Sequence, residues 1–372
     1  MKLSINKNTL VVIIFFLSIS VISLGMMLKL DRLPQNTENR KLAELPSIKL
    51  EVNALELYPK KFKHYFNDHF GFRNTFVIMN FLIRHNILRE SPSSQVLLGK
   101  DGWLFYTNDR AIEDYRGITH FDDEILKAIA KSHESKREWL SKQGIRYILV
   151  FAPNKETIYG EWMPDYLFKI RNRSGMDEII DYIMNNTNVD IIDLRKPLFD
   201  NKIREQLYLK TSSHWNNYAG FLAYLEIMKP VSKWFPDAKA NSLEEFSIKR
   251  EEIRGGDLAE MMGGGDYFRE QNITLIPKKP RKARKVDYNP LGTYKDPFAM
   301  KQENNDLPRV IVFRDCFFDE IIPFFSENFQ YSRYYWQSWN PDTPIAEMIN
   351  SVRPDIVIEE KIERFLKLPK SP

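Results

Sequence analysis

An uncharged apolar run at the N-terminus, Thr9–Leu28, is the feature that most restricts what this chain can fold into. Its length is about the 20 residues that a helix needs to cross the hydrocarbon core of a bilayer. No small-residue cleavage signal follows Gly25, so we expect an uncleaved signal-anchor and not a secretory signal peptide. Lys2 and Lys7 precede the run, which predicts that the amino terminus is cytoplasmic and the rest of the chain lies outside, although Lys29 after the run reduces the charge asymmetry.

The anchor divides the chain into four predicted parts: a cytoplasmic tip at 1–8, the transmembrane signal-anchor at 9–28, a linker with juxtamembrane helices at 29–90, and one large domain at 91–366. Apolar residues between Tyr65 and Leu82 recur at helical spacing. A break near Gly71 indicates a pair of amphipathic helices and not one long helix.

Strand and helix patterns alternate through the large domain. Tyr147–Phe151 is an uninterrupted apolar run of the kind that is buried on both faces of a parallel sheet. Further strands are predicted at Val189–Leu194, Val310–Phe313 and Asp355–Ile358, with helices at Asp122–Gln143, Met176–Asn185 and Tyr218–Phe235. This alternation predicts an α/β fold in which helices cover both faces of a mainly parallel sheet. A short hairpin is expected between Val96 and Tyr106.

Composition excludes several classes of function. The chain has 54 Lys and Arg against 50 Asp and Glu, a formal net charge of +4, which is too small and too evenly spread to indicate a nucleic-acid partner. The basic cluster Lys278–Lys285 is predicted to be a solvated loop, with contact to anionic lipid or polysaccharide as the alternative. One cysteine excludes an internal disulfide framework, and no metal-ligand spacing is present, so we expect neither a metal nor a cofactor.

The loops after the apolar strands are the places where a ligand would bind, because open α/β sheets bind ligands beyond the carboxyl ends of their strands. Cys316 occupies the turn after Val310–Phe313, where a nucleophile is exposed to substrate. His214 lies in a polar loop that follows the core strands, and an imidazole there could take the thiol proton. The alternative is structural, since a lone cysteine is often a small buried hydrophobe.

Other polar and aromatic side chains flank these two residues. Candidates for binding substrate or stabilising an oxyanion are Asn154, Lys155, Tyr159, Arg314, Asp315 and Trp215. Lys155 could contact the carboxylate of a uronate, although loop lysines are usually solvated. Trp103 and its hairpin neighbours are expected in the core, whereas the aromatic segment from Tyr334 to Trp339 fits a glycan groove as well as a core.

The order and spacing of these segments resemble the SGNH-hydrolase-like polysaccharide O-acetyltransferases of the alginate type. The segments that carry the resemblance are Glu38–Arg40, Asp68–Arg73, Gly99–Tyr106, Pro153–Lys155, His214–Asn216, Gly256–Ala259, Arg314–Phe317 and Glu363–Arg364. The resemblance implies an SGNH-like αβα sandwich and an Asp, His and Ser triad. In this chain His214 matches, Ser212 stands at the aspartate position and Cys316 at the serine position.

Two functions remain open on this resemblance. In the first, the protein is a periplasmic O-acetyltransferase or acetylesterase that acts on sugar hydroxyls of a cell-envelope or exopolysaccharide. Cys316 carries the acyl group, His214 is the base, and the amide of Asn216 or Asn217, or a carboxylate from elsewhere in the chain, orients the imidazole. The acetyl donor partner would be a multispanning membrane acyltransferase, and the chain would be a single-pass protein of the inner membrane. In the second, the protein is a catalytically silent relative that binds polysaccharide or scaffolds the membrane partner.

Deletion of residues 1–30 is expected to give a soluble protein, because the anchor is the only long apolar run in the sequence. Purification without detergent checks this expectation. A deletion product that needs detergent to stay in solution would contradict it.

Overall fold

The computed structural model describes residues 6–28, 30–31, 42–48, 52–289, 292–293, 295–339 and 343–366. The chain forms two compact units, Met1–Val96 with Arg254–Phe268, and Leu97–Ile253 with Arg269–Pro372. Each unit is described by itself below. The predicted charged flank at Lys29 and the segment Glu38–Arg40 lie outside the described residues.

The first unit is helical. Its elements are α1 (Lys7–Met27), α2 (Val52–His69), α3 (Arg73–Leu82), the π-helical turn η1 (Ile83–Leu88) and α10 (Asp257–Met261). The described part of α1 is apolar and long enough to cross a membrane, as the sequence predicts. The predicted helix pair is confirmed, and the break lies at Gly71, where the next residue, Phe72, has a left-handed φ of 61°.

The second unit contains a seven-stranded sheet in the order β4-β3-β11-β9-β10-β8-β7. The strands are β4 (Asp190–Asp193), β3 (Arg146–Ala152), β11 (Ile356–Ile362), β9 (Arg309–Phe313), β10 (Tyr331–Tyr335), β8 (Phe298–Lys301) and β7 (Arg284–Val286). The five strands from β4 to β10 are parallel, which confirms the prediction for the centre of the sheet. The antiparallel edge of β8 and β7 is additional. It corrects the prediction of a loop for the basic cluster, because Arg284 and Lys285 lie in β7.

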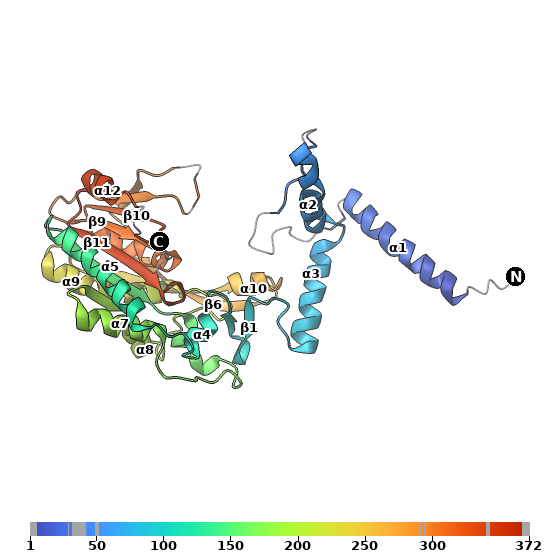
Figure 1. Ribbon diagram of the computed structural model, residues 1–372, viewed down its shortest axis with the longest axis horizontal. Coiled ribbons are helices and arrows are strands. Elements are labelled where there is room, and N and C mark those ends of the chain that lie inside the picture. The colour runs from blue at the N-terminus through green and yellow to red at the C-terminus, as the bar shows by residue number, and fades with distance from the viewer. Residues whose placement is uncertain are drawn as a thin grey trace. The chain divides into compact units, whose positions relative to one another are not determined.

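Helices cover both faces of this sheet, so the fold is the predicted αβα sandwich (Figure 1). One core joins Ile148 and Val150 of β3 to α8 (Arg195–Asn201), α9 (Asn217–Trp234) and α11 (Ile322–Phe325). The other joins Leu149 and its alternate neighbours to α5 (Asp123–Ser141), α7 (Gly175–Asn186) and α12 (Ile345–Val352). Side chains of a strand alternate between faces, so one apolar strand supplies both cores.

Two small two-stranded sheets complete the described strands. The predicted hairpin is confirmed as β1 (Val96–Leu98) and β2 (Leu104–Tyr106), whereas the pair β5 (Phe246–Arg254) and β6 (Arg269–Pro277) was not predicted. β5 is largely exposed and charged, which hides it from a search for apolar runs. Short helical segments are α4 (Ala111–Tyr115), α6 (Lys155–Ile158), η2 (Lys100–Gly102), η3 (Gly160–Trp162), η4 (Leu243–Glu245), η5 (Cys316–Glu320), η6 (Ser326–Asn328) and η7 (Glu363–Phe365).

Candidate active site

The site lies where three neighbouring strands end. In the register of the sheet, Ile362 of β11 pairs with Ala152 of β3, and Glu359 of β11 pairs with Phe313 of β9. The loops after β3, β11 and β9 therefore leave the same edge of the sheet side by side. These loops contain Asn154, Arg364 and Cys316 respectively, and the edge is the one where α/β sheets bind ligands.

His214 and Cys316 are in direct contact at this edge. The imidazole Nε2 lies 3.0 Å from the Sγ atom, although 102 positions separate the two residues in the chain. Cys316 is the first residue of η5, immediately after the turn that follows β9, and its thiol is only partly buried. The geometry is that of a nucleophile and a base within hydrogen-bond reach of each other.

The other imidazole nitrogen, Nδ1, faces a serine hydroxyl. Ser213 Oγ lies 3.2 Å from Nδ1, whereas Ser212 Oγ accepts a hydrogen bond of 3.2 Å from the backbone N–H of His214. The resemblance assigned the position of the orienting aspartate to Ser212. In the structure the hydroxyl of Ser212 binds the backbone of His214, and the hydroxyl of Ser213 faces the imidazole ring.

Two asparagines that were candidates to replace the aspartate use their side chains elsewhere. Asn216 Oδ1 caps α9 by accepting from the N–H of Ala219, and its Nδ2 donates to the carbonyl of Gln206. Asn217 donates to Glu320 and accepts from the N–H of Leu275. Both residues fix the loop that carries His214 and leave the ring to other groups.

Three carboxyl groups in residues 314–320, called the nucleophile turn below because they surround Cys316, interact electrostatically with His214. Burial raises the pKa of Asp315, Asp319 and Glu320, and the imidazole opposes this rise in all three. Asp319 also forms an ion pair of 2.6 Å with Arg314. A positive charge on His214 during proton transfer would therefore be stabilised from the turn that carries the thiol.

Asp315 holds the nucleophile turn in shape. Its two carboxyl oxygens accept from the N–H groups of Phe317 and Ile362, at 2.9 and 3.0 Å. Its own N–H donates to Glu360 of β11 at 3.0 Å. Burial raises the pKa of both carboxyl groups, and the proximity of Asp315 raises the pKa of Glu360 further. Asp315 is therefore a scaffold of the turn, tied to the neighbouring strand β11 by two hydrogen bonds and to Phe317 within the turn by a third.

Lys155 binds the loop of residues 211–217, called the histidine loop below. Its Nζ donates to the carbonyl oxygens of Leu104, Lys210 and Ser212 at 2.6, 2.7 and 2.9 Å. The side chain is 1% exposed and lies over the ring of Trp103. The expectation that Lys155 is solvated is therefore wrong. Its ammonium group is buried against three carbonyl oxygens and has a structural role, which places it out of reach of a uronate.

Asn154 lies at the carboxyl end of β3 with its amide group unused. Its backbone N–H donates to Glu363 at 2.8 Å, and Glu363 also accepts from the hydroxyl of Thr157. Within the described part of the chain, neither side-chain atom of Asn154 has a hydrogen-bond partner, although the residue is 1% exposed. A buried amide without partners is costly, so a bound group could supply them.

The remaining predicted residues pack around this centre. Trp215 is buried, and its Nε1 donates to the carbonyl of Phe317 at 2.9 Å, which joins the two loops of the site. Tyr159 is also buried, and its hydroxyl accepts from the N–H of Leu207. The guanidinium of Arg314 lies over the half-buried ring of Trp336, 4.8 Å from its centroid.

Most of the aromatic side chains that were considered for a glycan groove lie in the core. Those that are buried are Trp103, Tyr334, Tyr335 and Trp339. No group of three or more His, Cys, Asp or Glu in the described ranges is placed to hold a metal ion.

Comparison with known proteins shows the family of this chain. Residues 96–289, just over half of the chain, match the family described as SGNH hydrolase-like domain, acetyltransferase AlgX. The chain belongs to this family. The matched residues include His214 and end before Cys316, so the family match itself does not reach the thiol.

The individual proteins that are similar to this chain have low sequence identity to it. A probable alginate O-acetylase AlgJ of Pseudomonas putida is 29% identical over 141 residues, which are 37% of this chain and 34% of that protein. The chain thus matches about a third of the length of this curated relative. PatB1 of Bacillus cereus has a TM-score of 0.54 at 14% identity, covering 72% of this chain and 95% of its own. A DHHW family protein of Eubacterium siraeum has a TM-score of 0.50 at 16% identity, covering 65% and 86%. These structures share the fold.

Sequence reasoning missed two residues that shape the site. Ser213 was overlooked in favour of Ser212, yet it directly precedes the histidine. Glu360 lies in the strand Ile356–Ile362, where three consecutive charged residues, Glu359, Glu360 and Lys361, interrupt the apolar pattern. Charged residues inside a strand that must be buried are unusual, and this signal was available in the sequence.

Replacing Glu363 by Gln is expected to make stability less dependent on pH. Burial raises the pKa of Glu363 to about 7, so the folded state binds a proton that the unfolded state releases near pH 4.5. The wild type loses stability as pH rises from about 4.5 to 7, by roughly 3 kcal/mol at full ionisation. The difference in unfolding free energy, Glu363→Gln minus wild type, should therefore increase over this range in denaturant titrations.

Asp177→Asn is the matched control for this measurement. The hydrogen bonds from Ser174 and Arg195 lower the pKa of Asp177 despite its burial, so its ionised form stabilises the folded state. The control should lose stability relative to wild type as pH rises to about 4, and the difference should stay constant between about 4.5 and 7. A Glu363→Gln profile that follows the same direction as Asp177→Asn would contradict a raised pKa.

Proposed function

We propose that this protein is an O-acetyltransferase, or an acetylesterase, that acts on a sugar hydroxyl of a cell-envelope or exopolysaccharide. The proposal rests mainly on the 3.0 Å contact between His214 Nε2 and Cys316 Sγ at the ligand-binding edge of the sheet. Membership of an acetyltransferase family supports the choice of an acetyl group.

In the first half of the proposed reaction, His214 takes the proton of the Cys316 thiol at Nε2. The thiolate then attacks the carbonyl carbon of an acetyl ester donor. A C–S bond forms, the C–O bond of the donor breaks, and the departing alkoxide takes the proton from the imidazolium. The product is an acetyl thioester on Cys316. Because a thiol is more acidic than a hydroxyl, this step demands less of the base than a serine nucleophile would.

In the second half, His214 takes the proton of the acceptor hydroxyl, and the sugar oxygen attacks the thioester carbonyl. A C–O bond forms, the C–S bond breaks, and the thiolate recovers its proton from His214. Water as the acceptor gives the esterase reaction. The unused amide of Asn154 is two strands away from Cys316, and we assign it the role of hydrogen-bond donor to the developing oxyanion.

The location and the donor complete the proposal. The apolar helix α1 anchors the chain in the inner membrane, and the catalytic unit lies in the periplasm. The acetyl group must then be delivered across the membrane, which requires a multispanning acyltransferase as partner. The curated relative, an alginate O-acetylase, supports a polysaccharide as acceptor.

One observation favours a second function. Ser213 faces Nδ1 where the related triads have a carboxylate, and loss of that carboxylate can cost about 10⁴ in turnover in a serine triad. A catalytically silent protein that binds polysaccharide, or scaffolds the membrane partner, is the alternative. Turnover of a small ester separates the two functions.

Purified protein is expected to hydrolyse 4-nitrophenyl acetate through Cys316. Cys316→Ala should reduce turnover to the uncatalysed rate, and His214→Ala should reduce it by about 10² or more, since that is the usual contribution of a general base. Thermal unfolding of each variant controls for folding. Wild-type turnover that is unchanged in folded Cys316→Ala would exclude the thiol as nucleophile.

The neighbouring serines offer a matched pair for the positioning role. Ser213→Ala removes the hydroxyl at Nδ1 and is expected to lower kcat and shift its pH profile, because the ring loses a partner. Ser212→Ala removes a backbone contact and should act mainly on stability. Equal pH profiles for wild type and Ser213→Ala would show that Ser213 does not position the imidazole.

A further inference from the structure

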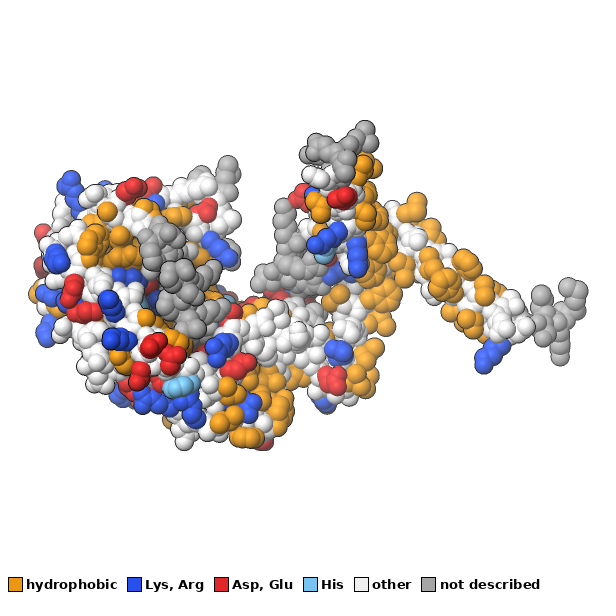
Figure 2. All heavy atoms as spheres, in the orientation of Figure 1, with side chains coloured by type: hydrophobic (Ala, Val, Ile, Leu, Met, Phe, Trp, Pro, Cys, Tyr) orange, Lys and Arg blue, Asp and Glu red, His pale blue; other side chains and the backbone are white. Residues whose placement is uncertain are grey.

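The helical unit exposes an apolar face that its described residues leave uncovered. Ten large hydrophobic side chains between residues 55 and 88 are exposed: Leu55, Leu57, Phe62, Phe66, Phe76, Met79, Leu82, Ile83, Ile87 and Leu88. Water-soluble surfaces rarely carry this many apolar side chains together, and such patches usually mark an interaction site. Figure 2 shows hydrophobic side chains along α2 and α3.

On α2 Leu55 and two exposed aromatic residues form one stripe, whereas the exposed Leu57 lies on the opposite side of the helix. Leu55, Phe62 and Phe66 are spaced by seven and four positions, which places them on one side of a helix. Phe62, Phe66 and Phe70 lie next to one another, with ring centroids 6.5 and 6.3 Å apart. The chain of rings continues onto α3 through Phe76, 6.2 Å from Phe70, so the stripe crosses the break between the two helices.

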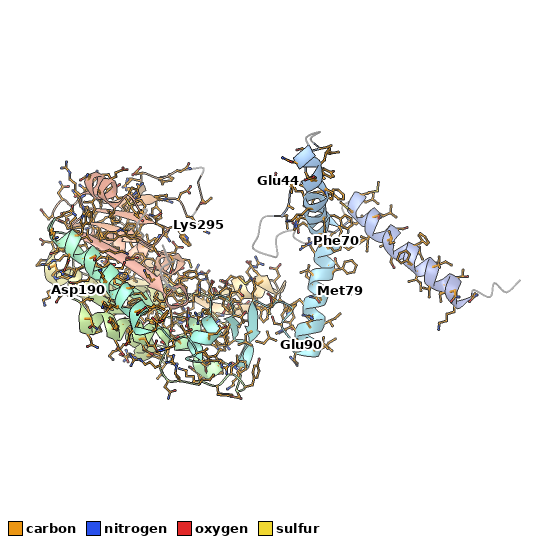
Figure 3. All side chains as sticks on the ribbon, viewed as in Figure 1. Glu44, Phe70, Met79, Glu90, Asp190 and Lys295 are labelled. Atoms are coloured by element: carbon orange, nitrogen blue, oxygen red, sulfur yellow. The ribbon has the colours of Figure 1, made fainter. Side chains whose placement is uncertain are left out.

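On α3 and η1 the apolar residues form two opposite faces. Phe81 is fully buried and packs edge-on against Tyr267 and Phe268 of the same unit. Residues at helical spacing on the other side, among them Met79 and Ile83, are 49% and 46% exposed. Figure 3 labels Phe70 and Met79 in this unit. Tertiary packing therefore explains the inner face and leaves the outer face without an occupant within the described residues.

Contacts with α1 show where this face lies. The carboxylate of Asp31, four residues beyond the end of α1, accepts from the N–H of Asn74 at 2.8 Å and from the hydroxyl of Thr75 at 3.3 Å. The backbone of Gly71 is so close to Ile22 that a Cβ atom would collide with it. The turn between α2 and α3 thus packs on the last turns of the apolar helix that is proposed to span the membrane.

The charges of α2 complement an anionic surface. Lys60, Lys61 and Lys63 are exposed on the helix, and Lys60 and Lys61 lie away from the stripe formed by Leu55, Phe62 and Phe66. An amphipathic helix with lysines beside an apolar, aromatic face is the pattern of a helix that lies in a membrane interface. Lysines close to anionic lipids add attraction that depends on the headgroup charge.

We propose that the outer face of α2, α3 and η1 lies in the interfacial layer of the bilayer, with aromatic and aliphatic side chains among the lipid chains and the lysines at anionic headgroups. This inference rests on the proposed anchoring by α1. It adds a second, reversible contact with the membrane that fixes the helical unit at the outer surface of the bilayer. Removal of α1 would still leave a water-soluble protein, because interfacial binding of such helices is reversible.

Spin-label accessibility tests the inference in the full chain. Cys316→Ser removes the native thiol, and single cysteines then carry a nitroxide at Phe76, Met79 or Ile83 of the outer face. Lys60 and Lys61 serve as controls on the polar side, and Phe16 of α1 reports lipid contact of the anchor. Vesicles contain phosphatidylethanolamine and phosphatidylglycerol, three parts to one. The ratio of oxygen to nickel-complex accessibility should be several-fold higher at the outer face than at Lys60 and Lys61.

The labels separate the outcomes. A lipid-like ratio at Phe16 with water-like values at Met79 and Ile83 would overturn the inference while the anchor stands. Water-like values at Phe16 would show instead that the proposed anchoring fails. Low accessibility to both reagents at Met79 and Ile83 would mean that protein covers the face, which also contradicts lipid contact. A smaller ratio in vesicles of phosphatidylcholine alone is the result expected if the lysines engage anionic headgroups.

Discussion

The position of β11 between β3 and β9 is the constraint on which the candidate site depends. Residues from the end of this strand bind both neighbouring loops: the N–H of Ile362 donates to Asp315, and Glu363 accepts from the N–H of Asn154. A strand from the end of the sequence therefore fixes the turn that carries the thiol and the loop that carries the unused amide. The site therefore depends on the pairing of β11 with β3 and β9, which brings together segments that are far apart in the chain.

Buried polar groups hold the site rigid and set its chemistry. Lys155 satisfies three carbonyl oxygens next to the histidine loop, and Asp315 accepts from the N–H of Phe317 in the nucleophile turn and from the N–H of Ile362 in β11. Satisfied networks of this kind favour one arrangement of a site, whereas an apolar core would tolerate several. In the candidate pair, Nδ1 of His214 faces the hydroxyl of Ser213. A thiol at position 316 would need less assistance from this imidazole than a hydroxyl would.

The sequence predicted the elements that follow simple hydrophobic patterns. The apolar strands β3 and β9, the helices α5, α7 and α9 and the membrane-length helix α1 were found at nearly their observed bounds. The strand β11 was predicted only as far as Ile358, and the covering helices α8, α11 and α12 were not predicted. The pair His214 and Cys316 was found because both residues follow core strands and parallel strands end at one edge. The antiparallel edge, β5 and β6 were not predicted, because β5 and β7 are largely exposed and charged. The strands β6 and β8 mix buried and exposed residues, and their pairing depends on partners outside the segment itself. Which serine faces the ring depends on side-chain direction within one turn, and spacing does not determine this.

Intact-mass analysis of the full chain after exposure to an activated acetyl ester tests the central claim most directly. The account predicts a single added acetyl group of about 42 Da, set by the chemistry of acyl transfer, mapped to the peptide that contains Cys316. The adduct should be absent in Cys316→Ala, form more slowly in His214→Ala, and be lost on addition of an acceptor sugar. Folded wild-type protein that acquires no adduct, or acquires it equally in Cys316→Ala, would contradict the thiol as acyl carrier.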